Sequence, residues 1–125
     1  GTLIADAPRA QFLFSHLGLP GKQGDISALL ELVPLNNVGI KLSGIYAIDP
    51  QPPHHGARPV LDLIFDRVPA RHLHWGSDFS PALGAIPFTQ TLEVPGLNEH
   101  APDNIAMMMG AGLMVKIANV CKAPD

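Results

Sequence analysis

The chain has little cysteine, little positive charge and no long hydrophobic run, and each shortage excludes a class of protein. Its 125 residues include a single cysteine, Cys121, so neither a disulfide framework nor a zinc site built on cysteines can form within the chain. Only 8 lysines and arginines stand against 11 aspartates and glutamates, without a basic cluster, so nucleic acid is not an expected partner. A reducing, cytoplasmic setting fits this composition best.

Membrane insertion is not expected either. The most apolar window, residues 105–115, ends at Lys116 and is well short of the roughly 20 residues that a membrane-spanning helix needs. The residues after Gly1 resemble the interior of a folded domain. They lack the charged segment followed by an apolar segment that is typical of a signal peptide, so the true N-terminus is expected to lie elsewhere. With 46% hydrophobic and 15% charged residues, the composition is that of a globular chain with one core.

Three segments have the pattern of β-strands. Residues 10–16 form an apolar, aromatic run that is closed by glycine and proline. Residues 38–43 alternate strictly between aliphatic and other side chains, which is the period of a strand. Residues 72–76 form a third short run, which ends in a polar turn that contains Asp78.

Helical patterns follow the first two strands. Residues 25–33 place apolar side chains at helical spacing, with Asp25 or Ser27 as the N-terminal cap and Pro34 ending the helix. After the proline-rich, irregular loop 44–58, a second helix is expected to begin at Pro59. Its apolar stripe consists of Val60, Leu61, Ile64, Phe65 and Val68. Beyond the third strand we expect a helical turn at residues 88–92 and a last helix at residues 103–118.

Strand and helix alternate through the chain, which is typical of parallel α/β folds because parallel neighbours need a crossover connection. A complete (β/α)8 barrel needs about 250 residues, so these 125 residues supply under half of one. The fold class is therefore predicted as α/β, a partial (β/α)8 TIM barrel of about three βα units. Residues 1–125 are expected to form a single portion of that barrel, without a second domain or an internal repeat.

In a barrel, one face of each strand points to the axis and the other to the surrounding helices. The aliphatic side chains of the second strand, Val38, Ile40 and Leu42, are expected to meet the helices. Leu73 and Trp75 should do the same on the third strand. The inward face would then carry Phe12, Phe14, His16, Gly39, Lys41, Ser43, His72, His74, Gly76 and Asp78.

Reactive side chains stand at the C-terminal ends of all three predicted strands, where barrel enzymes place their active sites. His16 ends the first strand, Lys41 and Ser43 end the second, and Asp78 follows the third. Together they could handle protons, an anion and a metal or a water. Two structural alternatives stay open: His16 as a hydrogen-bonded structural histidine, and Asp78 as the aspartate of an Asx-type turn.

Three motifs in fixed order carry a resemblance to a known family. They are FSHLGLPG at residues 14–21, NVGIKLSGIY at residues 37–46 and HWGSDFSP at residues 74–81. The chain resembles the lactonase-like branch of the amidohydrolase-related (amidohydrolase 2) TIM-barrel hydrolases, which includes 2-pyrone-4,6-dicarboxylate lactonase and L-fuconolactonase. The resemblance spans nearly the whole chain and implies that it corresponds to strands 6, 7 and 8, the C-terminal part of the barrel.

The resemblance also implies roles for the two residues at the strand ends. His16 is similar to the strand-6 histidine that polarises the scissile carbonyl or binds a metal, and Asp78 to the strand-8 aspartate that activates water as general base. A divalent metal such as zinc is implied for the complete enzyme, with His16 and Asp78 among its ligands. The ligands expected on strands 1 and 5 lie outside this chain, so a complete metal site cannot be assembled from it.

Five further residues are candidates for contact with a small-molecule substrate. They are Lys41, Ser43, Tyr46, His54 and His55. Lys41 would lie near a substrate anion, because a lysine that points to a barrel axis needs such a partner. The histidine pair belongs to a loop that would cover the barrel mouth, where a contact with substrate is the alternative to the default of an exposed loop pair. The pair His72 and His74 is expected to be structural, because it precedes the strand end.

These expectations lead to one function and two rivals. The chain is predicted to belong to a hydrolase in which water, activated by Asp78, attacks a lactone or a similar carbonyl substrate, although the isolated chain is expected to be inactive. One rival is a decarboxylase of the same superfamily. The other is a non-catalytic remnant that acts as an oligomeric binding or structural module, because open sheet edges favour self-association or binding to the missing barrel half.

Overall fold

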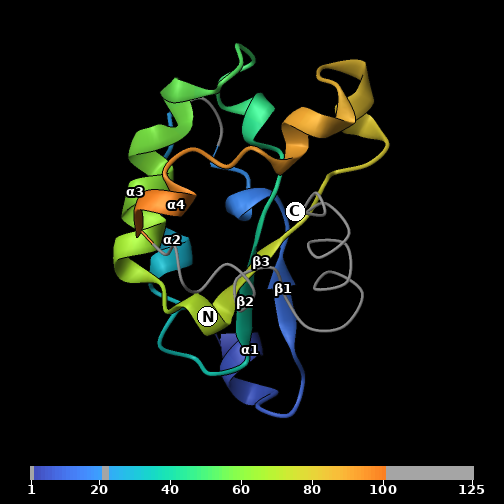
Figure 1. Cartoon of the computed structure of the whole chain (residues 1–125). Coiled ribbons are helices and arrows are strands. Elements are labelled where there is room, and N and C mark those ends of the chain that lie inside the picture. Colours follow the sequence, from blue (N-terminus) through green and yellow to red (C-terminus); the bar gives the residue numbers. More distant parts are fainter. Residues whose placement is uncertain (1, 21–22, 101–125) are drawn as a thin grey trace, which may run out of the picture.

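The computed structural model describes residues 2–20 and 23–100 and contains a three-stranded parallel sheet of order β1-β2-β3 (Figure 1). The strands are β1 (Phe12–Phe14), β2 (Val38–Leu42) and β3 (Leu73–Trp75). Phe12 is aligned with Val38, and Ile40 with Leu73. Since each strand pairs with its neighbour in sequence, the predicted three βα units appear as a small parallel α/β fold.

Four α-helices and six 3-10 segments connect and flank the described strands. The α-helices are α1 (Thr2–Asp6), α2 (Ser27–Leu30), α3 (Arg58–Arg67) and α4 (Leu97–His100). The 3-10 segments are η1 (His16–Gly18), η2 (Ile45–Ala47), η3 (His55–Ala57), η4 (Ala70–His72), η5 (Pro81–Gly84) and η6 (Phe88–Leu92). No helix in the described ranges is long and apolar enough to cross a membrane.

The helix α3 follows its sequence pattern closely. Pro59 occupies the first turn, where its missing N–H costs nothing, and Val60, Leu61 and Ile64 are buried. The helix predicted at residues 25–33 is shorter than expected, since only α2 is helical and turns follow it up to Pro34. Pro34 disfavours helical backbone at Val33 and has no N–H to donate to Leu30, so the regular helix does not continue to residue 33.

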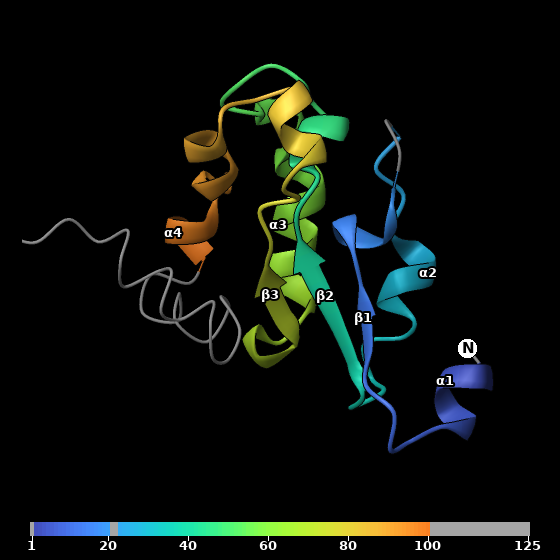
Figure 2. The same ribbon diagram turned by 90° about the vertical axis from the view of Figure 1, so that its right-hand side faces the viewer.

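The core lies between the sheet and one layer of helices (Figure 2). Ile40 and Leu42 from β2 and Leu73 from β3 pack with buried side chains of α2 and α3. The aliphatic face of β2 therefore meets the helices, as predicted. The other face, called here the second face of the sheet, carries Leu13, Gly39, Lys41 and His74.

The predicted face of the first strand is wrong. Phe14 is aligned with Ile40 and packs against the helix-covered core, so it does not point to the second face. Leu13 takes that face instead: a Cβ placed on Gly39 would lie 3.3 Å from Leu13 Cδ1. The alternation failed as a guide because β1 ends at Phe14 and His16 has a positive φ of 54°, which turns the chain out of the strand.

The third strand is also shorter than predicted, and this changes the place of His72. His72 belongs to η4, is buried, and has Nδ1 2.6 Å from the carbonyl oxygen of Val38, to which it donates. This hydrogen bond gives His72 a structural role. His74 does lie on the second face, next to Gly39, and its pKa is lowered by burial and by His72.

Two features of the N-terminal part have no counterpart in the predictions. The helix α1 precedes β1, and the buried Asn37 side chain holds this segment in place. Asn37 Nδ2 donates to the carbonyl oxygens of Ile4, Ala7 and Ala10 at 3.3, 3.1 and 3.0 Å. The predicted helix at residues 103–118 and Cys121 lie outside the described residues.

Candidate functional site

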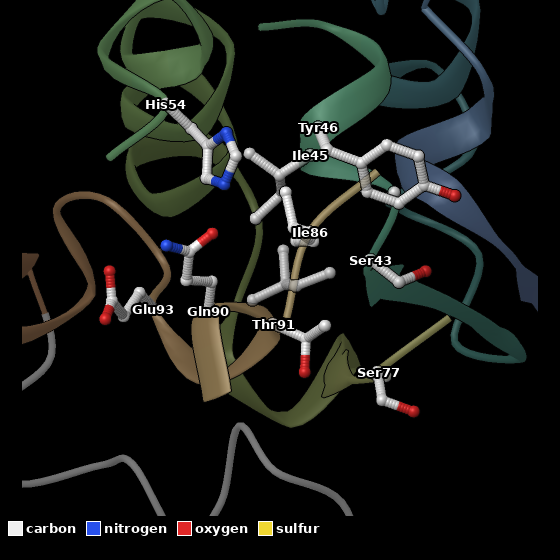
Figure 3. A pocket seen from close by; sticks show the side chains of 12 residues that line it. Ser43, Ile45, Tyr46, His54, Ser77, Ile86, Gln90, Thr91 and Glu93 are labelled. Atoms are coloured by element: carbon white, nitrogen blue, oxygen red, sulfur yellow. The ribbon is translucent and has the colours of Figure 1, made fainter. Parts of the chain in front are cut away.

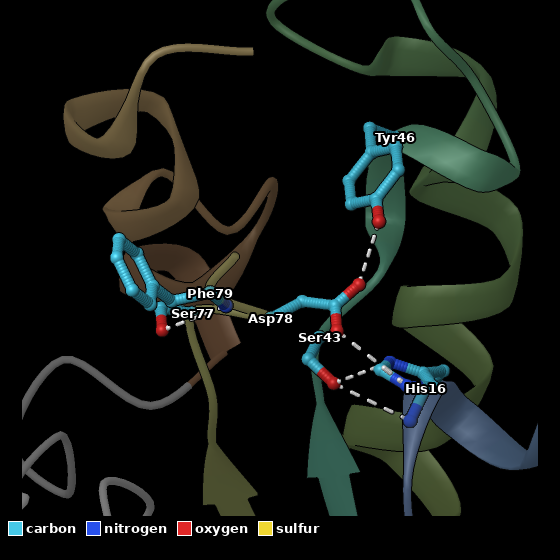
Figure 4. Close-up of polar contacts among 6 residues, drawn as sticks. All are labelled: His16, Ser43, Tyr46, Ser77, Asp78 and Phe79. Atoms are coloured by element: carbon cyan, nitrogen blue, oxygen red, sulfur yellow. Dashed lines mark hydrogen bonds and ion pairs between the residues drawn. The ribbon is translucent and has the colours of Figure 1, made fainter. Parts of the chain in front are cut away.

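The carboxyl ends of the three strands bring His16, Ser43, Tyr46 and Asp78 into one polar group (Figure 4). His16 follows β1, Ser43 and Tyr46 follow β2, and Asp78 follows β3. In a parallel sheet the carboxyl ends of all strands lie at the same end of the sheet, so residues far apart in sequence become neighbours. The sequence prediction placed His16, Ser43 and Asp78 together for this reason.

His16 is held by Ser43 on one side of its ring. Ser43 is only 3% exposed, and its Oγ lies 3.3 Å from the backbone N of His16 and 3.0 Å from His16 Nδ1. The hydroxyl accepts the backbone N–H and can in turn donate its own proton to Nδ1. In that arrangement the ring proton resides on Nε2, which faces Asp78.

Gly44 allows this close approach. Its φ is +68°, and a Cβ at this position would lie 3.0 Å from His16 Nδ1. A larger residue would therefore have to adopt an unfavourable backbone conformation and displace the imidazole. The KLSG motif thus supplies both the hydroxyl that holds His16 and the glycine that leaves room for it.

Asp78 directs both carboxylate oxygens at side chains from the other strand ends. Tyr46 Oη donates to Oδ2 at 2.6 Å, and His16 Nε2 lies 3.6 Å from Oδ1. The local amide N–H of Phe79 is accepted by Ser77 Oγ instead. The side chain of Asp78 is therefore available to the site. Its backbone has a φ of +53°, in the left-handed region, which aspartate enters more readily than most residues other than glycine.

The bond to Asp78 changes the acidity of Tyr46. This hydrogen bond, followed by burial and by the negative charge of Asp78, raises the pKa of Tyr46 to about 12. The phenol therefore stays protonated at neutral pH and remains a hydrogen-bond donor. Of the predicted substrate-binding residues, Tyr46 is the one that directly contacts Asp78.

A cavity of about 350 Å³ opens beside this polar group. It is lined by His16, Leu19, Pro20, Gly44, Tyr46, Ala47, Ile48, Asp78 and Pro81. A cavity of this size is within the range that holds small organic ligands. The sequence prediction missed its apolar lining, which comes from the segment after η1, from the end of η2 and the residue after it, and from the start of η5, because the first two segments were interpreted as loops without a fixed direction.

Lys41 does not line this cavity. It lies on the second face of the sheet, and its aliphatic stem crosses Gly76, where an added Cβ would be 2.6 Å from Lys41 Cδ. The role of Lys41 near a substrate anion stays a prediction.

The two loop histidines lie in different surroundings. His54 is 1% exposed, with Nδ1 donating to the carbonyl oxygen of Asp49 at 2.6 Å, whereas His55 is exposed. The expectation of an exposed histidine pair is therefore wrong for His54, because its ring is bonded to Asp49 and faces a small cavity that Ile86 and Gln90 also line. His55 lines a separate cavity of about 370 Å³ together with Arg58 and Glu99.

His54 and Tyr46 line a small cavity of about 10 Å³ beside the site (Figure 3). Asp49, which was not among the residues predicted from the sequence, stabilises the loop that carries both. Asp49 Oδ1 accepts the N–H of Gln51 at 3.0 Å and Oδ2 that of Gly56 at 2.7 Å. The hydrogen bond from Gly56 and, to a smaller extent, that from Gln51 lower the pKa of Asp49. An aspartate before a proline-rich turn is the signal that could have identified it.

The described residues do not fit a complete metal site. No group of three or more His, Cys, Asp or Glu side chains that could hold a metal ion occurs in residues 2–20 and 23–100. A catalytic zinc takes three protein ligands, and here only His16 and Asp78 converge. A metal site would need further ligands from outside the described residues.

Comparison with known proteins gives the family. Residues 1–110 match the family model described as Amidohydrolase. No curated protein and no solved structure matched the chain. Because the matched segment covers most of the 125 residues and includes all three strands, it also contains His16, Ser43, Tyr46 and Asp78. The chain therefore belongs to the amidohydrolase family, which indicates a hydrolase-type function in general.

Proposed function

We propose that the chain is the C-terminal portion of a (β/α)8-barrel lactonase and that Asp78 is its general base. The observation that carries this proposal is the position of Asp78, between Tyr46 and His16 and at the wall of a cavity large enough for a lactone. The order of three parallel strands, each ending in a residue of this group, agrees with the final three units of such a barrel.

In this proposal the two oxygens of Asp78 have separate tasks. Tyr46 occupies Oδ2, which leaves Oδ1, on the side of His16, to accept a proton from water. The side chain of Asp78 is 15% exposed, so the carboxylate is accessible but mostly shielded from bulk solvent. A base fixed in this way needs little reorganisation at the moment of reaction.

The hydrolysis then proceeds in two steps. Asp78 takes one proton as the water oxygen bonds to the lactone carbonyl carbon, and the N–H at Nε2 of His16 stabilises the oxyanion that forms. The ring C–O bond then breaks, and the leaving alkoxide oxygen takes the proton from Asp78. The product is a hydroxy acid. Ser43 contributes by holding the His16 ring in the tautomer that points N–H toward the site.

A divalent metal such as zinc belongs to the proposal only for the complete enzyme. His16 and Asp78 would hold it, and when bound it would act as a Lewis acid on the carbonyl. The remaining ligands would have to come from outside the described residues, so no step is assigned to a metal here. Contact of Lys41, His54 and His55 with substrate, and a cytoplasmic location, stay predictions.

A second candidate function is a non-catalytic, self-associating module. The observation in its favour is the side chain of Leu13, which is 56% exposed on the second face of the sheet. Apolar side chains on an uncovered sheet face favour association with a second copy or with the missing barrel half.

The isolated chain was expected to be inactive, but it brings His16, Tyr46 and Asp78 together beside a cavity, so lactone hydrolysis by the chain, with and without added zinc, tests the proposal. Asp78→Asn should lower kcat/KM by about 10² to 10⁴, the usual contribution of a general base. The matched control is Asp66→Asn, an exposed aspartate on α3, which should leave turnover unchanged. If the folded chain shows no turnover that depends on Asp78, the lactonase proposal fails for this chain and the non-catalytic candidate gains support.

A further inference from the structure

We propose that the small cavity of about 10 Å³ beside the site binds one internal water molecule, which joins the loop after β2 to the segment after β3. This water donates one hydrogen bond to His54 Nε2 and one to Gln90 Oε1, two buried atoms at the same cavity (Figure 3). The inference goes beyond the proposed function and does not depend on it, because neither residue takes part in the proposed reaction.

His54 Nε2 is a buried hydrogen-bond acceptor. The residue is 1% exposed, and its Nδ1 donates to the carbonyl oxygen of Asp49 at 2.6 Å. In the neutral ring, a proton on Nδ1 leaves Nε2 with a lone pair that can only accept. Nε2 has no hydrogen-bond partner among the described residues. A buried acceptor in this position has lost its bonds to bulk water, so a donor at the cavity would stabilise it.

Gln90 Oε1 brings a second acceptor to the same cavity. This oxygen is also buried and has no hydrogen-bond partner in the part of the chain that the structure describes. In Figure 3 the carboxamide oxygen of Gln90 points towards the His54 ring, and both residues line the cavity. Two acceptors cannot bond to each other, but one water molecule has two protons and can donate to both. Gln90 as a whole is only half-buried, so its carboxamide can rotate to complete the contact.

The size and the other polar groups of the cavity favour water as the occupant. A volume of about 10 Å³ is at the lower limit of the space that holds one water molecule and is far too small for an organic ligand. Two neighbouring hydroxyl protons are already used, since Tyr46 donates to Asp78 and Thr91 Oγ1 donates to the carbonyl oxygen of Phe88 at 2.7 Å. A water molecule therefore supplies donors that these side chains do not.

The water would connect two segments at the carboxyl end of the sheet. His54 belongs to the loop after β2, which also carries Tyr46, whereas Gln90 belongs to η6. The segment η6 is itself held on β3, because Trp75 Nε1 donates to the carbonyl oxygen of Thr91 at 2.9 Å. The bridge through the water would thus fix the loop of Tyr46 to a segment that is anchored on the sheet.

A crystal structure of the full chain, from crystals grown without ammonium or metal salts, tests the site directly. We expect one peak of electron density within about 3.2 Å of both His54 Nε2 and Gln90 Oε1. A direct hydrogen bond between the two side chains, a metal ion in the cavity, or no density between the two atoms would overturn the inference.

Magnetisation transfer from water to the His54 ring, measured by NMR on the full chain, detects the same molecule in solution. Gln90→Met keeps the hydroxyl groups around the cavity but removes one of the two acceptors, so the bound water loses half of its hydrogen bonds. Transfer to the ring proton between the two nitrogens should occur in the unsubstituted chain and be lost in Gln90→Met. No transfer in the unsubstituted chain, or equal transfer in both proteins, would contradict the inference.

Urea denaturation measures whether the two residues share one partner. Gln90→Met should lower the equilibrium constant for folding about tenfold, because His54 Nε2 then loses its donor. Gln51→Met, at an exposed glutamine of the same loop, is the matched control and should change the constant by no more than about twofold. In His54→Leu/Gln90→Met the combined loss should be about tenfold smaller than the product of the two single losses, since both substitutions break the same bridge. An unchanged constant in Gln90→Met, or single losses that multiply, would show that no water joins the two side chains.

Discussion

At the scale of single residues, the hydrogen bond between Tyr46 and Asp78 can be tested directly through the pKa of Tyr46. The bond raises the pKa of Tyr46 to about 12, and no other tyrosine contributes to the phenolate absorbance. We expect Tyr46 to ionise near pH 12 in the native chain and nearer to its ordinary value of 10.0 in Asp78→Asn. Ultraviolet titration, with the fluorescence of Trp75 as a monitor of folding, gives both midpoints.

The same raised pKa makes stability depend on pH. Because the folded state holds the Tyr46 proton more tightly than the unfolded state, the bond contributes its full stability below about pH 10 and loses it as the pH rises through 12. The contribution should be absent in Asp78→Asn. Coincident ionisation in the two proteins would show that the bond does not persist in solution.

Ser43 is expected to act on the reaction through His16. In Ser43→Ala, the backbone N–H and the Nδ1 of His16 both lose their partner, so the ring can rotate or change tautomer. We expect kcat for lactone hydrolysis to fall about tenfold with little change in KM, because the interaction with His16 matters in the transition state. Ser43→Thr, which keeps the hydroxyl, should restore most of the activity. A change in KM alone would indicate direct substrate binding by Ser43 instead.

At the scale of secondary-structure elements, Asn37 links α1 to the start of β2. Its side-chain amide donates to Ile4, Ala7 and Ala10, and Asn37 is buried. Asn37→Ala would leave these carbonyl oxygens without that donor, at a cost of about 1–3 kcal/mol in the free energy of unfolding. Urea denaturation measures this loss. Asn36→Ala, at the exposed neighbour, is the control and should change stability by less than about 0.5 kcal/mol.

At the scale of the whole molecule, we expect the chain to associate through the second face of the sheet and the outer edges of β1 and β3. Among the described residues, no strand pairs with either outer edge, and Leu13 is 56% exposed. We expect the weight-average mass in analytical ultracentrifugation to rise above the 13.3 kDa of the monomer as concentration increases. Leu13→Lys should weaken this association and Leu63→Lys should not. A monomer at every concentration would contradict the prediction.

The sequence alone determined the order of the three strands with α2 and α3 between them, and the helix-facing side of β2. The period-two pattern of residues 38–43 predicted β2 and its helix-facing residues, and the stripe after Pro59 predicted α3. These predictions succeeded because hydrophobic periodicity directly reflects which side chains a helix or strand can bury. The ordered motifs around His16, KLSG and Asp78 also predicted the family.

Only the tertiary structure decided how the site is put together. The face of Phe14, the burial of His54 and the bond from Tyr46 to Asp78 depend on positive φ angles at His16, His54 and Asp78. Such angles are costly for residues other than glycine, and they persist only where contacts from distant segments fix them. No periodic pattern encodes these contacts, because His16, Tyr46 and Asp78 meet only once three parallel strands have paired.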